Sequence, residues 1–194
     1  LGVMSGTSLD GIDLAICSFY KKHKWEFNIE KSKTIKYSKY WRKTLAHLHK
    51  KNKKIISRID LEYGKFLGKT IHNYLKNEKI DFIASHGHTI FHQPKNKLTL
   101  QIGHGNTIAN ITKIKTINNF RNLDISLNGQ GAPLVPIGDL HLFREYKYCV
   151  NLGGFANISI KNNGIIKAFD ICPVNIVLND ICKRLFLEFD NSGL

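Results

Sequence analysis

The sequence lacks any apolar run close to the roughly 20 residues that a membrane-crossing helix needs, and it shows no signal-peptide pattern. Its 4 cysteines, Cys17, Cys149, Cys172 and Cys182, form no CxxC pair. This scatter argues against a zinc site or a disulfide framework and favours free thiols in a reducing cytoplasm. With 42% apolar and 23% charged residues, the 194-residue chain is not of the disordered class, and it is long enough for one domain or one and a half.

Acidic residues are also scarce, since 15 Asp and Glu stand against 29 Lys and Arg and the net charge is +14. Such an excess can indicate a nucleic-acid-binding domain. Most of it lies between Lys21 and Lys79, around helical patterns, with few arginines and no alternation of aromatic and basic residues. We therefore interpret it mainly as a solvated lysine-rich face, and nucleic-acid binding is the less favoured alternative.

Residues 1–13 combine two short apolar runs with a turn of small residues, Ser5-Gly6-Thr7-Ser8, and a following Asp10-Gly11 pair. The pattern predicts a β-hairpin, in which glycine lets the backbone approach a ligand closely. Hydroxyls and exposed N–H groups in such a turn suit a phosphate, and Asp10 could hold a cation beside it. The competing interpretation is a hairpin turn that binds nothing.

The rest of the chain alternates strand and helix patterns. After the hairpin we expect a strand at 25–29, helices at 41–49 and 55–75, a buried parallel strand at 80–85, a strand at 98–102, a helix at 105–112, a strand at 114–117 and a long loop at 118–136. Three more strands follow at 148–153, 155–160 and 165–170, and then a helix at 174–187. This order predicts an α/β fold whose opening pattern restarts. We expect a first lobe at 1–145 and the start of a second at 146–194.

Polar segments stand at the ends of these expected elements, where ligands of open α/β sheets bind. The turn at Gly153-Gly154 mirrors the first hairpin turn, so it is a second candidate phosphate grip. Two such turns facing each other across a cleft would clamp a polyphosphate, as phosphoryl transfer requires. Asp170 is expected directly after an apolar strand, where it is either a general base or the N-terminal cap of the next helix.

Two further segments carry groups that can contact a polar ligand. His86 and His88 are expected in a glycine-containing turn, bound to a polar ligand, to the protein or, least favoured, to a metal. Arg121 and Asp124 precede a kinked loop that presents Gln130. This pair either makes hydrogen bonds to an oxyanion or to hydroxyl groups of a ligand, or forms a surface ion pair.

The motifs in these segments occur in a fixed order along the whole chain. They are GVMSGTSLDGID at 2–13, SHGHTI at 85–90, QIG at 101–103, FR at 120–121 with Asp124, GQGAPLVP at 129–136 and NLGGFANIS at 151–159. In order and spacing this set resembles the anhydro-N-acetylmuramic acid kinase family. The chain is similar to only part of such a kinase. We therefore expect either a piece of a longer gene product or a truncated, non-catalytic remnant as the alternative function.

The resemblance implies an actin/hexokinase-like ATPase fold of the ribonuclease H-like type, with a complete first lobe and a truncated second one. It implies a cytoplasmic kinase that uses ATP and Mg²⁺. The reaction phosphorylates O6 of 1,6-anhydro-N-acetylmuramic acid while water opens the anhydro ring, giving N-acetylmuramic acid 6-phosphate in peptidoglycan recycling. The expected partners are the amino sugar and ATP rather than a membrane, and a homodimer is left open.

The resemblance also implies roles for individual residues. Asp170 falls on the family's catalytic aspartate, which activates the attacking water, and this outweighs the capping interpretation. Asp10 is the candidate Mg²⁺ ligand. The expected contacts to the ATP phosphates are Gly6, Thr7, Ser8, Leu9, Asp10, Gly11, Ile12, Asp13, Gly153, Gly154 and Asn157. The expected contacts to the sugar are His86, Thr89, Arg121, Asp124 and Gln130. Among the departures, His104 stands where the family commonly has Asp or Asn.

Overall fold

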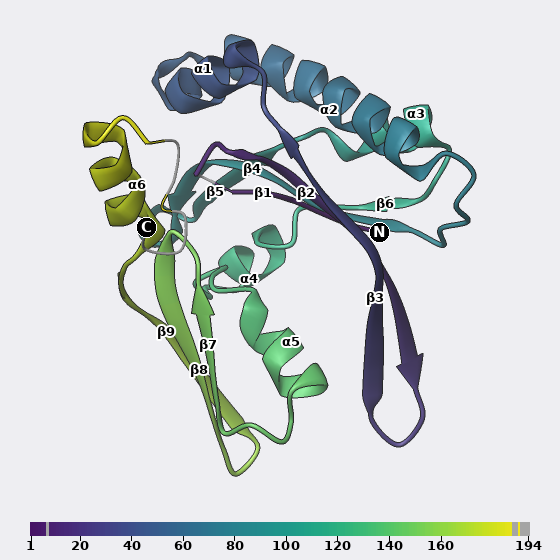
Figure 1. Cartoon of the computed structure of the whole chain (residues 1–194), viewed down its shortest axis with the longest axis vertical. Helices are drawn as coiled ribbons and strands as arrows, with labels where there is room; N and C mark the ends of the chain where they lie inside the picture. Colours follow the sequence, from purple (N-terminus) through teal and green to yellow (C-terminus); the bar gives the residue numbers. More distant parts are fainter. Residues whose placement is uncertain (7, 188–189, 191–194) are drawn as a thin grey trace. The chain divides into compact units, whose positions relative to one another are not determined.

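A computed structural model describes residues 1–6, 8–187 and 190 of the chain. It divides the chain into two compact units. The first comprises residues 1–20 and 27–132, and the second comprises residues 21–26 and 133–194. Figure 1 labels the helices and strands of both units.

The first unit is built on a six-stranded mixed sheet in the order β3-β2-β1-β4-β5, with β6 paired to β4. Its strands are β1 (Gly2–Ser5), β2 (Gly11–Lys21), β3 (Trp25–Lys36), β4 (Ile83–Gln93), β5 (Leu98–Ile102) and β6 (Thr116–Ile117). Strand β1 pairs antiparallel with β2 and parallel with β4. The predicted first hairpin and the predicted buried parallel strand are therefore confirmed.

Helices cover one face of this sheet (Figure 1). They are α1 (Lys39–His47), the 3-10 turn η1 (Leu48–Lys50), α2 (Lys53–Leu75) and α3 (Gly105–Thr112). The side chains of Ser38 and Asn52 accept hydrogen bonds from the first turns of α1 and α2, as N-caps do. His104 takes the same role at α3, where its Nδ1 accepts from the Thr107 N–H at 3.3 Å. The imidazole thus does there what Asp or Asn does at other N-caps.

The core of the first unit forms between this helical layer and the sheet. Strand β2 alternates, so that Ile12 and Leu14 are buried while Asp13 is exposed. Helix α2 contributes Tyr63, Leu67 and Ile71, which are fully buried. Buried side chains recur about every 3.6 residues along the helices and every 2 residues along the strands. The apolar patterns of the sequence therefore predicted both element types.

The second unit holds a separate antiparallel sheet in the order β7-β8-β9. Its elements are α5 (Val135–Leu142), β7 (Tyr148–Leu152), β8 (Phe155–Asn162), β9 (Ile165–Pro173) and α6 (Asn175–Arg184). The predicted second set of three strands followed by a helix is confirmed. Both units combine helices with sheets, so the predicted α/β class is also confirmed. The predicted lobe boundary near residue 145 stays a prediction.

Four local predictions were wrong. Strand β3 runs to Lys36 rather than to residue 29, and the His86–His88 segment lies inside strand β4 rather than in a turn. The expected loop at 118–136 contains the short helix α4 (Asn122–Ser126) and the start of α5. Asp170 lies within β9, which continues to Pro173, rather than after the strand. For the three strands the cause is pairing with neighbouring strands, which local patterns do not contain.

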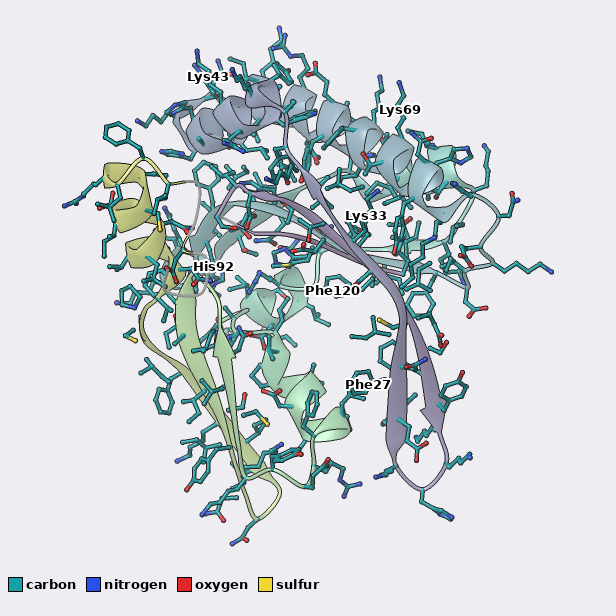
Figure 2. The ribbon with its side chains drawn as sticks, viewed as in Figure 1. Phe27, Lys33, Lys43, Lys69, His92 and Phe120 are labelled. Atoms are coloured by element: carbon teal, nitrogen blue, oxygen red, sulfur yellow. The ribbon has the colours of Figure 1, made fainter. Side chains whose placement is uncertain are left out.

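The lysine-rich segment coincides with α1, α2 and β3. Lys43 and Lys69 extend from the outer side of the two helices, away from the sheet (Figure 2). This arrangement supports the interpretation of a solvated face. Among the described residues, no helix combines the length and apolarity that spanning a membrane requires.

Candidate functional site

The candidate phosphate loop connects β1 to β2 in the first unit. Asp10 Oδ1 accepts hydrogen bonds from the Ser8 hydroxyl at 2.8 Å and from the Gly11 N–H at 2.9 Å. The Leu9 N–H donates to the Gly6 carbonyl at 3.4 Å, and Leu9 has φ 60°, in the left-handed region. These contacts close the loop into a tight turn. Thr7, which was predicted to contact phosphate, lies outside the described residues.

Three residues predicted to contact phosphate, Gly11, Ile12 and Asp13, lie at the start of strand β2. Some of them are buried and one is exposed. Gly11 lies so close to β3 that an added Cβ would be 2.4 Å from the Ile35 carbonyl oxygen. Ile12 is fully buried. Asp13 is exposed, and its Oδ1 accepts from the Thr34 hydroxyl at 2.6 Å. Ile12 therefore contributes packing, whereas Asp10 and Asp13 are the carboxylates of this segment that solvent reaches.

A buried polar cluster lies at the start of the loop, formed by Ser5, Tyr37, Tyr63 and His88. Ser5 Oγ is 2.5 Å from the Tyr37 hydroxyl, 3.0 Å from the Tyr63 hydroxyl and 3.1 Å from His88 Nδ1. The Tyr37 and Tyr63 hydroxyls also hydrogen-bond to each other. Neither tyrosine was among the residues predicted from the sequence. The only signal was Tyr63 itself, a residue with a polar tip on the apolar face of the predicted helix at 55–75.

His86 and Arg121 form a further polar contact in the first unit. The Nε and Nη2 groups of Arg121 donate to His86 Nε2 at 3.1 and 2.9 Å, and Nη1 donates to the Gly131 carbonyl at 2.7 Å. His86 Nδ1 lies 2.9 Å from the Gly87 carbonyl, to which it donates its proton. Burial lowers the pKa of His86, and the charge of Arg121 lowers it further. A neutral imidazole therefore accepts from Arg121 and fixes its guanidinium.

Asp124 holds the other side of the same loop. Its Oδ2 accepts from the Gly131 N–H at 2.6 Å, and its backbone carbonyl accepts from the Gly129 N–H at 2.7 Å. Arg121 and Asp124 thus bind the carbonyl and the N–H of Gly131 respectively, and the described residues show no ion pair between them. Gln130 is exposed between the two glycines. The arrangement presents an amide side chain on a loop that is fixed at both sides.

Thr89 and His88 lie next to each other in strand β4. Thr89 is half-buried in β4, opposite Gln101 of β5. Burial lowers the pKa of His88 to about 4, so its imidazole is neutral at physiological pH. Among the described residues, no group of at least three His, Cys, Asp or Glu side chains could hold a metal ion by itself. A cation at Asp10 would need further ligands from a bound molecule or water, as Mg²⁺ commonly does.

In the second unit, the Gly153-Gly154 turn lies against the beginning of α6. The Val174 N–H donates to the Gly154 carbonyl at 2.9 Å, and the Asn175 N–H donates to the Gly153 carbonyl at 3.2 Å. The Gly153 N–H donates within the turn to the Phe155 carbonyl at 3.2 Å. The turn is therefore held by both glycine carbonyls and by the Gly153 N–H.

Asp170 is exposed on β9 of the second unit, directly opposite Asn157 of β8. The register shifts at this point, because Asn157 pairs with Asp170 whereas Ala156 pairs with Cys172. Val174, not Asp170, occupies the N-cap position of α6, so the capping interpretation of Asp170 is wrong. Its carboxylate is thus available for chemistry at an irregular position of the sheet, a common location for functional side chains.

The family model described as anhydro-N-acetylmuramic acid kinase matches residues 1–194. The curated kinase of that name from Bacillus cereus (strain ATCC 10987 / NRS 248) is 33% identical, over 99% of this chain and 56% of the relative. The one from Bacillus anthracis (strain CDC 684 / NRRL 3495) is 34% identical, over 99% and 56%, and the one from Bacillus thuringiensis subsp. konkukian (strain 97-27) is 33% identical, over 100% and 56%. The chain spans about half the length of the curated relatives it matches. Because the family model matches every residue, the chain belongs to the anhydro-N-acetylmuramic acid kinase family.

Proposed function

We propose that the protein to which this chain belongs is an ATP-dependent kinase of 1,6-anhydro-N-acetylmuramic acid. It phosphorylates O6 while water opens the anhydro ring, and the product is N-acetylmuramic acid 6-phosphate. The observation that carries the proposal is the family match over residues 1–194. We further propose the actin/hexokinase-like fold, with lobes at 1–145 and 146–194, and a role in peptidoglycan recycling in the cytoplasm.

The loop between β1 and β2 is proposed to bind the ATP phosphates. Backbone groups at Gly6 and Ser8 suit phosphate oxygens, while the Ser8 hydroxyl and the Gly11 N–H hold the Asp10 carboxylate beside them. Asp10 would supply one oxygen to Mg²⁺, with the others coming from phosphates and water, which is the usual way in which kinases hold this ion. Mg²⁺ would neutralise charge that develops on the phosphates. Gly153, Gly154 and Asn157 of the second unit are proposed for the same ligand.

The sugar contacts are proposed to come from the β4 segment and the loop around Gly131. Three nitrogens of Arg121 are already engaged by His86 and Gly131, so the guanidinium is fixed before a ligand arrives. A preorganised donor loses little entropy on binding. Arg121, Gln130 and Thr89 are therefore proposed as direct contacts. His86 and Asp124 are proposed to act by holding Arg121 and the loop.

Asp170 is proposed as the general base. A water oxygen attacks the anomeric carbon, and its proton passes to the Asp170 carboxylate. The bond from the anomeric carbon to the bridging oxygen breaks, and the electrons of that bond leave on O6. O6 then forms a bond to the γ-phosphorus, and ADP leaves. A positioned carboxylate is sufficient for the proton transfer, and its contribution is typically ~10²–10⁴-fold in rate.

The test is a coupled assay on the longest protein that the gene encodes, with this 194-residue chain assayed in parallel. We expect one ADP and one new reducing sugar for each anhydro sugar consumed, with both dependent on Mg²⁺. N-acetylmuramic acid, which has no anhydro bridge, is the control substrate and should give no matching turnover. Absence of product from the longer protein would overturn the proposal and favour a non-catalytic remnant.

A further inference from the structure

The hydroxyls of Ser5, Tyr37 and Tyr63 form a closed triangle, with each group hydrogen-bonded to the other two. Each hydroxyl has one proton to donate. The three bonds are therefore all made only if each hydroxyl donates once around the ring. The fourth bond, between Ser5 and His88, then takes its proton from Nδ1 of the imidazole. Because Tyr63 donates to Ser5, Ser5 donates to Tyr37 and Tyr37 donates to Tyr63, so every donor of the cluster is used.

Tyr37 contacts both ends of the candidate phosphate loop. Its hydroxyl binds Ser5, the residue before Gly6, and its backbone N–H donates to the Asp10 carbonyl at 3.3 Å. The ring itself is buried and packs beside Tyr63 and Phe66, with centroids 6.4 and 6.3 Å away. A buried residue that directly follows β3 thus bridges the start and the end of the loop.

We propose that the Tyr37 hydroxyl is a positioning group that fixes the conformation of the phosphate loop at residues 6 and 8–10. It acts through Ser5 and does not touch the ligand. The assignment of the ligand as ATP rests on the proposed function, whereas the control of the loop by Tyr37 does not. The consequence is specific, because losing this hydroxyl should weaken ATP binding and leave sugar binding unchanged.

The variant Tyr37→Phe removes the hydroxyl and keeps both the ring and the backbone bond to Asp10. Tyr74→Phe is the matched control, because the Tyr74 hydroxyl is buried and has no hydrogen-bond partner among the described residues. Amide hydrogen exchange in residues 6–10, followed by mass spectrometry of this chain, is the first measurement. We expect about tenfold faster exchange or more in Tyr37→Phe, because its hydroxyl makes two buried hydrogen bonds, to Ser5 and to Tyr63, and no change in Tyr74→Phe.

Ser5→Ala provides a test of the pathway. If Tyr37 acts through Ser5, the double variant should loosen the loop no more than Ser5→Ala alone, because residues that act as one unit are not additive. Equal exchange in Tyr37→Phe and the wild type would overturn the proposal. Additive effects in the double variant would overturn the route through Ser5.

Kinetics of the longer protein separate a positioning role from a merely structural one. We expect the KM for ATP to rise about tenfold in Tyr37→Phe, with the KM for the sugar and kcat within twofold of the wild type. An unchanged KM for ATP despite a loosened loop would overturn the positioning role. If the wild type phosphorylates nothing, the proposed function fails, and the exchange measurement still decides whether Tyr37 fixes the loop.

Discussion

Arg121 donates two N–H groups of its guanidinium to a single acceptor, the Nε2 atom of His86, at 3.1 and 2.9 Å. This contact requires the imidazole to be neutral, and burial together with the Arg121 charge keeps the pKa of His86 below its ordinary value. The two residues lie 35 positions apart in the sequence, so the contact ties β4 to the segment that carries α4 and Gly131.

The first prediction concerns the acceptor on residue 86. His86→Gln places an amide oxygen near the position of Nε2, whereas His86→Ala removes the acceptor and releases Arg121. We expect the KM for the sugar to rise at least tenfold in His86→Ala, because a charge-assisted hydrogen bond contributes about 1.5–3 kcal/mol. His86→Gln should recover part of the loss. Steady-state kinetics at saturating ATP provide the measurement, and identical KM values for both variants would contradict this role.

The second prediction concerns Gly87, which has φ 73° within β4. An added Cβ would lie 2.3 Å from the Ile102 carbonyl oxygen, so Gly87→Ala combines backbone strain with a clash against β5. Gly164 has a similar φ of 79° and nothing within 4 Å of its added Cβ, so Gly164→Ala isolates the strain.

We expect Gly87→Ala to lower the free energy of unfolding by about 3 kcal/mol or more, and Gly164→Ala by about 1 kcal/mol. Urea unfolding followed by circular dichroism gives both values. Equal losses in the two variants would show that the approach of β5 to Gly87 has no energetic consequence.

The sequence predicted the elements whose stability comes from local periodicity. Strand β5 (Leu98–Ile102) and helix α3 (Gly105–Thr112) have the predicted bounds, because their apolar spacing and flanking glycines are complete within each segment. Strand β4 was predicted to end at Ser85 because the polar His86–Thr89 segment follows. Its backbone continues as a strand because it pairs with β5, with Thr89 opposite Gln101, which no local pattern contains.

Most of the candidate site followed from motifs, but its supporting contacts did not. The motifs indicated Asp10, His86 and Arg121 as functional residues, and their roles stay predictions. The bond of Tyr63 to Ser5 joins residues 58 positions apart, and no motif marks either tyrosine of the cluster. Such contacts depend on how α2 and β3 pack against β1, which is tertiary information.

The third prediction concerns pH. Burial lowers the pKa of His88 to about 4, against 6.5 for an ordinary imidazole. Between these values the unfolded chain binds a proton that the folded chain does not, so stability falls as the pH falls. The contribution is fully present above about pH 6.5 and is lost toward pH 4. We expect a loss on the order of 2 kcal/mol between pH 7 and pH 5 from this group.

His88→Asn keeps a donor near the position of Nδ1 and removes the titration. The unfolding free energy of this variant should therefore fall less steeply over the same pH range than that of the wild type. Urea unfolding at several pH values gives the slopes. A wild-type slope in His88→Asn would contradict the assignment of the pH dependence to His88.

The last prediction concerns Asp170, which is exposed and pairs across the sheet with Asn157. Asp170→Asn keeps the size of the side chain and removes its basicity, and because the group is exposed we expect no measurable change in Tm. In the longer protein, kcat should fall about 10²–10⁴-fold, the usual contribution of a general base, with the KM for the sugar within a few-fold of the wild type. The control is Asp180→Asn. Asp180 is exposed on α6, and its ion pair with Arg184 is of the surface kind that contributes little to stability. The turnover of this variant should stay within twofold of the wild type. Full turnover in Asp170→Asn would remove this carboxylate from the mechanism, because no amide can accept the proton that water loses.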